Sequence, residues 1–145
     1  MTIIPHALTG AALGRLVFRK RYLAFLAGIG SHIFLDMVPH WDFLTIRAGA
    51  INTALALACV IFLSRRYKDP YLFWGAVGAM APDIEVATSA LGLSSGKLYF
   101  PTHSGTLPHI QASSWWSIPV QGLLTLICFL LIVKDEKLGL ARQGV

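Results

Sequence analysis

The sequence predicts an all-α fold, namely a single domain over residues 1–145 built as an integral membrane bundle of about five helices. The composition is oily, because 55% of the residues are hydrophobic and only 13% are charged. The apolar residues form long runs, and most lysines and arginines lie at the ends of these runs, which is typical of membrane helices. All five histidines and four of the seven acidic residues, in contrast, lie on one side of the runs.

Each predicted helix corresponds to one apolar run. The helices are expected over residues 3–18, 22–38, 48–64, 70–91 and 115–133, with an outer loop over residues 92–114. The first, with roughly 16 residues, is short for a bilayer that takes about 20. The second ends before Pro39, because a proline disfavours helical geometry at the preceding residue.

The remaining helices are bounded by charged or helix-breaking residues. The third ends at the basic segment 65–68, and the fourth begins near Asp69-Pro70. Pro82 is expected to kink the fourth helix, because proline removes a backbone hydrogen-bond donor. The fifth ends before the polar tail that starts at Lys134.

The loop charges predict the orientation of the helices. Only Arg47 and Lys97 lie on the side opposite to the other basic residues. Because basic loops stay in the cytoplasm, we expect the N-terminus outside and the C-terminus in the cytoplasm of a bacterial-type inner or plasma membrane. Topology thus explains the net charge of +5, so no nucleic-acid partner is expected. The partners are the lipid bilayer and an amphiphilic substrate, and a homo-oligomer stays open.

A layer of ionisable groups is predicted toward the outer side. It holds all five histidines and four of the seven acidic residues: His6, His32, Asp36, His40, Asp42, Asp83, Glu85, His103 and His109. A helical rise of about 1.5 Å per residue places several of these groups at one depth. Such groups cost roughly 2.5–3.5 kcal/mol each inside a membrane, so they indicate a functional site.

The sharpest motif runs from residue 31 to residue 42. His32 and Asp36 are four residues apart and share one helix face, while Pro39 directs His40 and Asp42 toward the mouth of the site. Imidazole and carboxylate ligands without a thiolate suit zinc, manganese or iron. The alternative is a hydrogen bond between His32 and Asp36 that only joins helices.

Two further motifs carry carboxylates and histidines. In Pro82-Asp83-Ile84-Glu85 the two carboxylates can serve a metal ion and a water, or Asp83 can simply cap a short helix. In Thr102-His103-Ser104 the histidine can act as a ligand or general base, or it can be a solvated loop residue. His109 is more readily explained as a solvated residue.

His6 opens a run in which Gly10 and Gly14 form a GxxxG face for close helix contact. This face is expected to bring His6 against the helix that carries His32. The predicted metal ligands are therefore His6, His32, Asp36, His40 and Asp83, with zinc favoured over manganese or iron. The predicted general acids or bases are Asp42, Glu85 and His103.

These motifs resemble those of small membrane-bound, metal-dependent hydrolases of the YdjM type. The resemblance rests on His6-x3-Gly10, Pro82-Asp83-Ile84-Glu85 and Thr102-His103-Ser104. The His32-x3-Asp36 element, followed by Pro39 and His40, is also similar to the metal-binding helix of zinc-dependent phospholipase C-like proteins. Glu85 stands where the YdjM pattern has aspartate. The resemblance implies a metal-dependent hydrolase.

The leading hypothesis is a membrane-embedded hydrolase that acts on a lipid phosphoester or similar amphiphile at the outer leaflet. One alternative is a metal-ion or proton carrier, which would need a polar path to the cytoplasm. The third and fifth helices offer few groups for that path: Asn52, Thr53, Gln121 and Thr125. The other alternative is a non-catalytic membrane scaffold whose polar layer fixes helix packing.

Overall fold

The computed structural model describes residues 1–18, 20–42, 45–112 and 115–134, and these residues form helices and loops without a strand. The helices are α1 (Ile3–Leu16), α2 (Arg21–Asp36), α3 (Ile46–Tyr67), α4 (Pro70–Met80), α5 (Asp83–Ala90) and α6 (Ser117–Lys134). The predicted all-α class is therefore confirmed. An isolated backbone bridge between His40 and Gln111 ties the segment after α2 to the loop before α6.

The fourth predicted helix is two helices in the structure. The hydrogen-bonded helix α4 ends at Met80 and α5 begins at Asp83, whereas Ala81 and Pro82 keep right-handed helical dihedral angles, so the expected kink at Pro82 is a break in the hydrogen-bond ladder. Because of this break, the described chain has six helices where the sequence predicted about five. The remaining helix ends differ from the predicted ones by a few residues.

Local capping explains where two of the long helices begin. The Thr45 hydroxyl accepts a hydrogen bond from the Ala48 amide at the start of α3. At the start of α4 the Asp69 carboxylate accepts from two backbone amides, and Pro70 follows at the first helical position. Asp69 also lies 3.3 Å from the Arg15 guanidinium, which joins the end of α1 to this turn.

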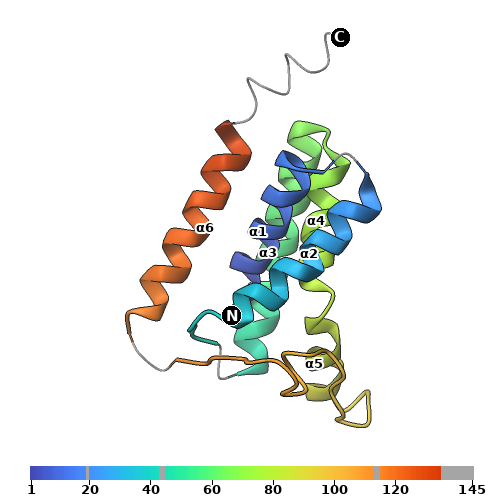
Figure 1. Ribbon diagram of the computed structural model, residues 1–145, viewed down its shortest axis with the longest axis vertical. Helices are drawn as coiled ribbons and strands as arrows, with labels where there is room; N and C mark the ends of the chain where they lie inside the picture. The colour runs from blue at the N-terminus through green and yellow to red at the C-terminus, as the bar shows by residue number, and fades with distance from the viewer. Residues whose placement is uncertain (19, 43–44, 113–114, 135–145) are drawn as a thin grey trace.

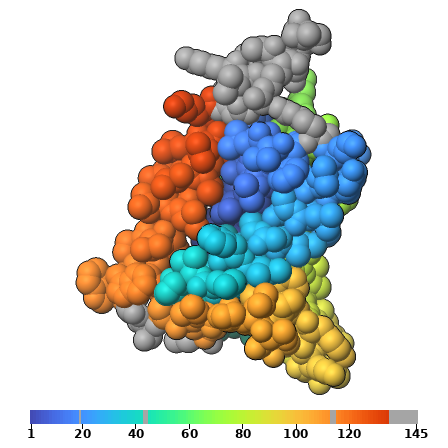
Figure 2. Space-filling view, in the orientation of Figure 1, coloured from blue at the N-terminus to red at the C-terminus, as the bar shows by residue number. Residues whose placement is uncertain are grey.

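The helices run alternately up and down, so their connections lie at two opposite ends (Figure 1). The α1–α2 and α3–α4 connections, which carry basic residues, lie at the same end as the last residues of α6. The N-terminus, α5 and the loop before α6 lie toward the other end. Figure 2 shows this loop spread across that end of the molecule.

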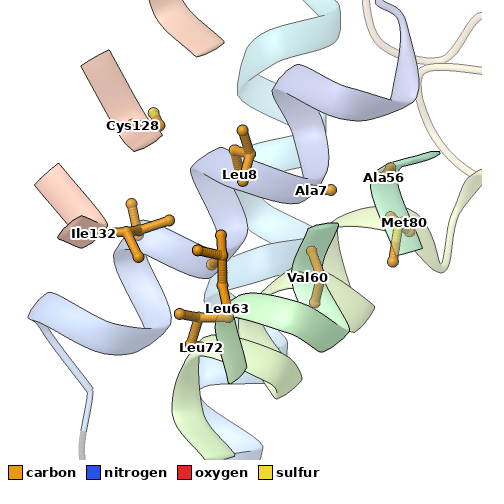
Figure 3. Packing of buried hydrophobic residues seen from close by; sticks show 12 residues of the cluster. Ala7, Leu8, Ala56, Val60, Leu63, Leu72, Met80, Cys128 and Ile132 are labelled. Carbon is orange, nitrogen blue, oxygen red and sulfur yellow. The ribbon is translucent and has the colours of Figure 1, made fainter. Parts of the chain in front are cut away.

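Helix α1 is the central element, because it packs against α2, α3, α4 and α6. Leu8 of α1 belongs to a hydrophobic cluster with side chains from α3, α4 and α6 (Figure 3). Val60, Leu63, Leu72 and Ile132 belong to this cluster, and each is at most 2% exposed. The free thiol of Cys128 also packs here, as expected for a reduced cysteine.

Glycines set how closely α1 and α2 approach α4. A Cβ atom on Gly10 would lie 2.3 Å from the Gly75 carbonyl oxygen, and one on Gly14 would lie 2.1 Å from the Tyr71 carbonyl oxygen. The GxxxG face therefore contacts α4 and not α2. The expectation that His6 lies against the helix of His32 is nevertheless confirmed, because the two rings stack with centroids 4.0 Å apart. Gly28 provides the corresponding contact between α2 and α4.

Two helices, α3 and α6, are long and apolar enough to cross a membrane. Within each, only 22% of the most apolar 18-residue window is buried inside the protein. Large apolar side chains are exposed on α2 and α3 as well, including Phe34 at 70% and Phe62 at 65%. A soluble monomer rarely exposes so much contiguous apolar surface.

Gly75→Ala should destabilise the protein, because the added Cβ would lie 2.1 Å from the Gly10 carbonyl oxygen and neither backbone can yield cheaply. We expect a cost of about 1–3 kcal/mol, the usual range for overpacking, and a lower Tm in thermal unfolding of the purified protein. Gly30→Ala is the matched control, because nothing lies within 4 Å of its added Cβ. Equal Tm values for the two variants would contradict this account of the packing.

Candidate metal centre

Asp36, the last residue of α2, lies at the centre of the polar cluster and is only 1% exposed. Its Oδ2 atom accepts a hydrogen bond of 2.7 Å from the Thr102 hydroxyl. The same oxygen lies 3.2 Å from His32 Nε2 and 3.6 Å from His103 Nε2. Its other oxygen, Oδ1, lies 3.3 Å from His6 Nε2. One buried carboxylate therefore joins α1, α2 and the loop before α6.

His32 is held in one orientation by α4. Its Nδ1 atom lies 2.7 Å from the Ala79 carbonyl oxygen, so Nδ1 carries the proton and donates it. In the neutral ring the lone pair is then on Nε2, which faces Asp36. The His6 ring stacks on His32 with centroids 4.0 Å apart. His6 is fully buried, and neither of its ring nitrogens has a hydrogen-bond partner in the described structure.

His103 comes from the loop before α6 and completes this side of the cluster. Its Nε2 atom lies 3.4 Å from His32 Nε2 and 3.6 Å from Asp83 Oδ1. Its Nδ1 atom lies 3.0 Å from Glu85 Oε1. Burial alone would lower the pKa of His103, but the carboxylates of Asp36 and Glu85 raise it above its usual value.

Asp83 is the first residue of α5 and does not cap it. The residue before the helix is Pro82, and the described structure shows no side-chain hydrogen bond that caps α5. Asp83 Oδ1 faces His32 and His103, whereas its buried Oδ2 atom has no hydrogen-bond partner. The capping alternative for this residue is therefore wrong.

Glu85 anchors the loop to α5. Its carboxylate accepts hydrogen bonds of 2.9 Å from the amides of Tyr99 and Phe100, besides its contact with His103. Burial opposes its ionisation, but these donors hold the pKa of Glu85 below its usual value. The carboxylate thus fixes both the path of the loop and the direction of the His103 ring.

A second group of polar atoms surrounds His40, which lies just after α2. Its Nδ1 atom donates to the Val38 carbonyl oxygen at 2.7 Å, and its Nε2 atom lies 2.9 Å from His109 Nε2. Asp42 Oδ2 lies 3.2 Å from His40 Nε2 and accepts a bond of 3.2 Å from Gln111. Burial would raise the pKa of Asp42, but hydrogen bonds from His109 and His40 hold it well below its usual range.

The structure brings every predicted site residue into this one cluster. The cluster also includes groups that were given no ligand or acid–base role from the sequence: Thr102, which bonds to Asp36, His109, which lies against His40, and the Met1 amino group, which lies 3.0 Å from Asp42 Oδ1 and 3.5 Å from Asp36 Oδ1. Thr102 belongs to the Thr-His-Ser motif, so its position beside His103 was the available signal. Ser104 is exposed and bonds to Pro101 and Thr106, so no contact joins it to the cluster in the described structure.

The spacing of the polar atoms suits metal binding. Three groups have ligand atoms within 4.8 Å of one another: His6–His32–Asp36, His32–Asp83–His103 and Asp36–His40–His109. Metal–ligand bonds of about 2.1 Å in a tetrahedron place the ligand atoms about 3.4 Å apart. The Nε2 atoms of His32 and His103 lie 3.2–3.8 Å from Asp36 Oδ2 and Asp83 Oδ1 and 3.4 Å from each other.

A cavity of about 420 Å³ borders the cluster. It is lined by Ile29, Ala81, Pro82, Glu85, Tyr99, Phe100 and Pro101, which are mostly apolar. Phe100, part of this lining, has its ring centroid 5.4 Å from that of His32 and 5.3 Å from that of His103. An apolar chain can therefore lie directly beside the metal-type ligands.

Comparisons with models of protein families, with curated proteins and with solved structures found no match to this chain. The resemblance to YdjM-type hydrolases therefore rests on the short motifs alone. Function has to be argued from the geometry and chemistry of the site.

Glu85→Ala should release the loop from α5 and loosen the His103 ring. Hydrogen bonds to a charged group contribute about 1.5–3 kcal/mol, so exchange of the Tyr99 and Phe100 amides should rise roughly 10- to 100-fold. Hydrogen–deuterium exchange with mass spectrometry measures this change. Ser104→Ala, which removes only exposed loop hydrogen bonds, is the control. Unchanged exchange at residues 99 and 100 would contradict the anchoring role.

Proposed function

We propose that the protein is a membrane-embedded, metal-dependent hydrolase acting on a lipid phosphoester or a similar amphiphile at the outer leaflet. The observation that carries the proposal is the direction of the imidazole lone pairs. His32 and His103 each have Nδ1 held by an oxygen atom, and their Nε2 atoms face each other at 3.4 Å. Two lone pairs at that distance repel unless a proton or a metal cation lies between them.

The surrounding carboxylates favour such a cation. Asp36 Oδ2 and Asp83 Oδ1 lie close to both Nε2 atoms. A divalent ion would thus have two imidazole and two carboxylate ligands, a set that suits zinc and also accepts manganese or iron. Contacts behind the ligands match those of known metal sites, in which a ligating histidine donates its other nitrogen to a carbonyl or carboxylate.

His6 supports the same centre from the opposite side of Asp36. Because it is fully buried with unpartnered ring nitrogens, it carries a desolvation cost that nothing else in the described structure offsets. Asp36 can use its two oxygens separately, with Oδ1 toward His6 and Oδ2 toward His32 and His103. We therefore retain His6 as a further ligand on the Oδ1 side.

The chemistry follows from the ligand set. A bound divalent ion lowers the pKa of a water molecule toward 7 and polarises a phosphoryl oxygen. Asp83 is placed to take the proton of the attacking water, because its Oδ2 atom has no other partner. Asp42 is the alternative base. Glu85 and His103 had been expected as acid or base, but their contacts favour positioning for Glu85 and ligation for His103.

The exposed apolar surface and the distribution of basic residues support a location in the membrane. Helices α3 and α6 have the length and apolarity to span a bilayer, and most of their apolar surface is not covered by protein. The basic connections lie at one end and the polar cluster at the other (Figure 1). We propose that α1–α4 and α6 lie in the membrane, with the N-terminus and α5 outside and the C-terminus in the cytoplasm.

The substrate class follows from the cavity beside the cluster. Its apolar lining suits a hydrocarbon chain, while the ligands beside Phe100 suit an anionic head group. An amphiphile could enter from the outer leaflet and place its polar part at the ion. A lipid phosphoester meets both requirements.

Asp36→Asn should abolish metal binding and lipid phosphoesterase activity while preserving the fold. The amide keeps the shape of the side chain but loses the charge that faces three imidazoles. Plasma mass spectrometry gives the metal content of detergent-purified protein, and release of phosphate or head group gives the activity. The control, Ser104→Ala, should retain both. Wild type that is free of metal and indifferent to chelator would instead favour the scaffold alternative.

The proposed topology predicts opposite labelling of two engineered cysteines. In a Cys59→Ala/Cys128→Ala background, Lys97→Cys should react with a membrane-impermeant maleimide on intact cells. Arg65→Cys should react only after the membrane is opened, because the α3–α4 connection is placed in the cytoplasm. Labelling of Arg65→Cys but not of Lys97→Cys on intact cells would indicate the opposite orientation. Equal labelling of both would argue against a spanning bundle.

A further inference from the structure

The polar atoms around His40 form a group that the ion proposed above does not use. His40 Nε2, His109 Nε2 and Asp42 Oδ2 lie 2.9–3.5 Å from one another. This group is held by backbone bonds: the His40 amide donates to the Ile110 carbonyl at 3.1 Å, and the Ala112 amide donates to the His40 carbonyl at 2.6 Å. Two segments far apart in the sequence are thus fixed side by side.

His40 and His109 face each other much as His32 and His103 do. His40 Nδ1 donates to the Val38 carbonyl oxygen, which leaves the lone pair of the neutral ring on Nε2. That atom faces His109 Nε2 at 2.9 Å, with the Asp42 carboxylate beside both. The pair needs a proton or a metal ion between the two nitrogens. The Asp42 carboxylate, which also lies 3.0 Å from the Met1 amino group, favours a positive charge there.

One ion cannot take every ligand in the cluster. Each imidazole with its Nδ1 held elsewhere offers a single lone pair, and zinc in proteins takes about four to five ligands. His32, Asp36, Asp83 and His103 already make up one such set. His109 lies between the two groups, because its Nδ1 atom lies 4.0 Å from Asp36 Oδ2 while its Nε2 atom faces His40.

We propose that His40, Asp42 and His109 hold a second divalent ion, so that the centre is binuclear. The inference rests on the proposed hydrolase function and deepens it, because two-ion sites clamp the attacking and leaving oxygens of a phosphoester between them. Exposure supports the arrangement. The side chains of Asp42, Asp83 and His109 are 23–27% exposed, whereas those of His32, Asp36 and His40 are at most 1% exposed. The substrate would therefore approach along the exposed edge shared by the two ion sites.

The experiment counts ions in variants of each group. Full-length protein in detergent is stripped with chelator, loaded with zinc alone, desalted and analysed by plasma mass spectrometry. We expect about two zinc ions per chain for wild type, and about one for His109→Ala and for His103→Ala. Asp42→Asn should also bind about one zinc ion. Because this change preserves the shape of the side chain, the same result from both variants shows that the loss in His109→Ala is not caused by a folding defect. Ser104→Ala should bind as wild type does, and circular dichroism checks helix content throughout.

The outcomes separate the two proposals. One ion in wild type that His103→Ala removes, but His109→Ala and Asp42→Asn leave in place, keeps the proposed function and overturns the second site. Two ions that persist in His109→Ala and Asp42→Asn also overturn it, since protons would then satisfy that group. Wild type without zinc overturns both proposals. Half the wild-type zinc content in His103→Ala, in His109→Ala and in Asp42→Asn supports the binuclear centre, whether or not the chosen phosphoester is hydrolysed.

Discussion

The buried carboxylate of Asp36 is the interaction on which the rest of the site depends. A charged group that is 1% exposed is very costly without partners, and here the partners come from three separate segments: His6 of α1, His32 of α2, and Thr102 and His103 of the loop before α6. The position of the loop is therefore tied to the position of α1. Removing the charge would take away one of the two carboxylates, Asp36 and Asp83, that face the Nε2 atoms of His32 and His103.

Close helix packing makes this arrangement geometrically feasible. Gly10 and Gly14 let α1 approach the backbone of α4, and Gly28 does the same for α2. Helix α4 then presents the Ala79 carbonyl to His32 Nδ1, and its break at Pro82 directs α5 across the end of the bundle. The glycines at one depth and the polar cluster at another belong to the same three helices. The close packing of these helices and the geometry of the polar cluster therefore depend on each other.

The contacts behind the histidines favour the proposed metal centre over a polar layer that merely joins helices. In a simple hydrogen-bonded layer, each imidazole would donate one proton and accept another within the layer. Instead, Nδ1 of His32, His40 and His103 is bound to an oxygen atom, while the Nε2 atoms of His32 and His103 face each other and that of His40 faces His109. This arrangement supports both proposed ion sites and, with the neighbouring apolar cavity, an amphiphilic phosphoester as substrate.

The sequence by itself determined the helical class, because runs of apolar residues bounded by charges and prolines have few other solutions. It also predicted which residues gather, since the i, i+4 spacing of His32 and Asp36 and a common helical rise set their face and depth. Only the tertiary structure decided that Glu85 turns to the loop, that His109 joins His40, and that the GxxxG face meets α4. These contacts join residues distant in sequence, and the direction of a loop side chain depends on backbone hydrogen bonds that no local pattern specifies.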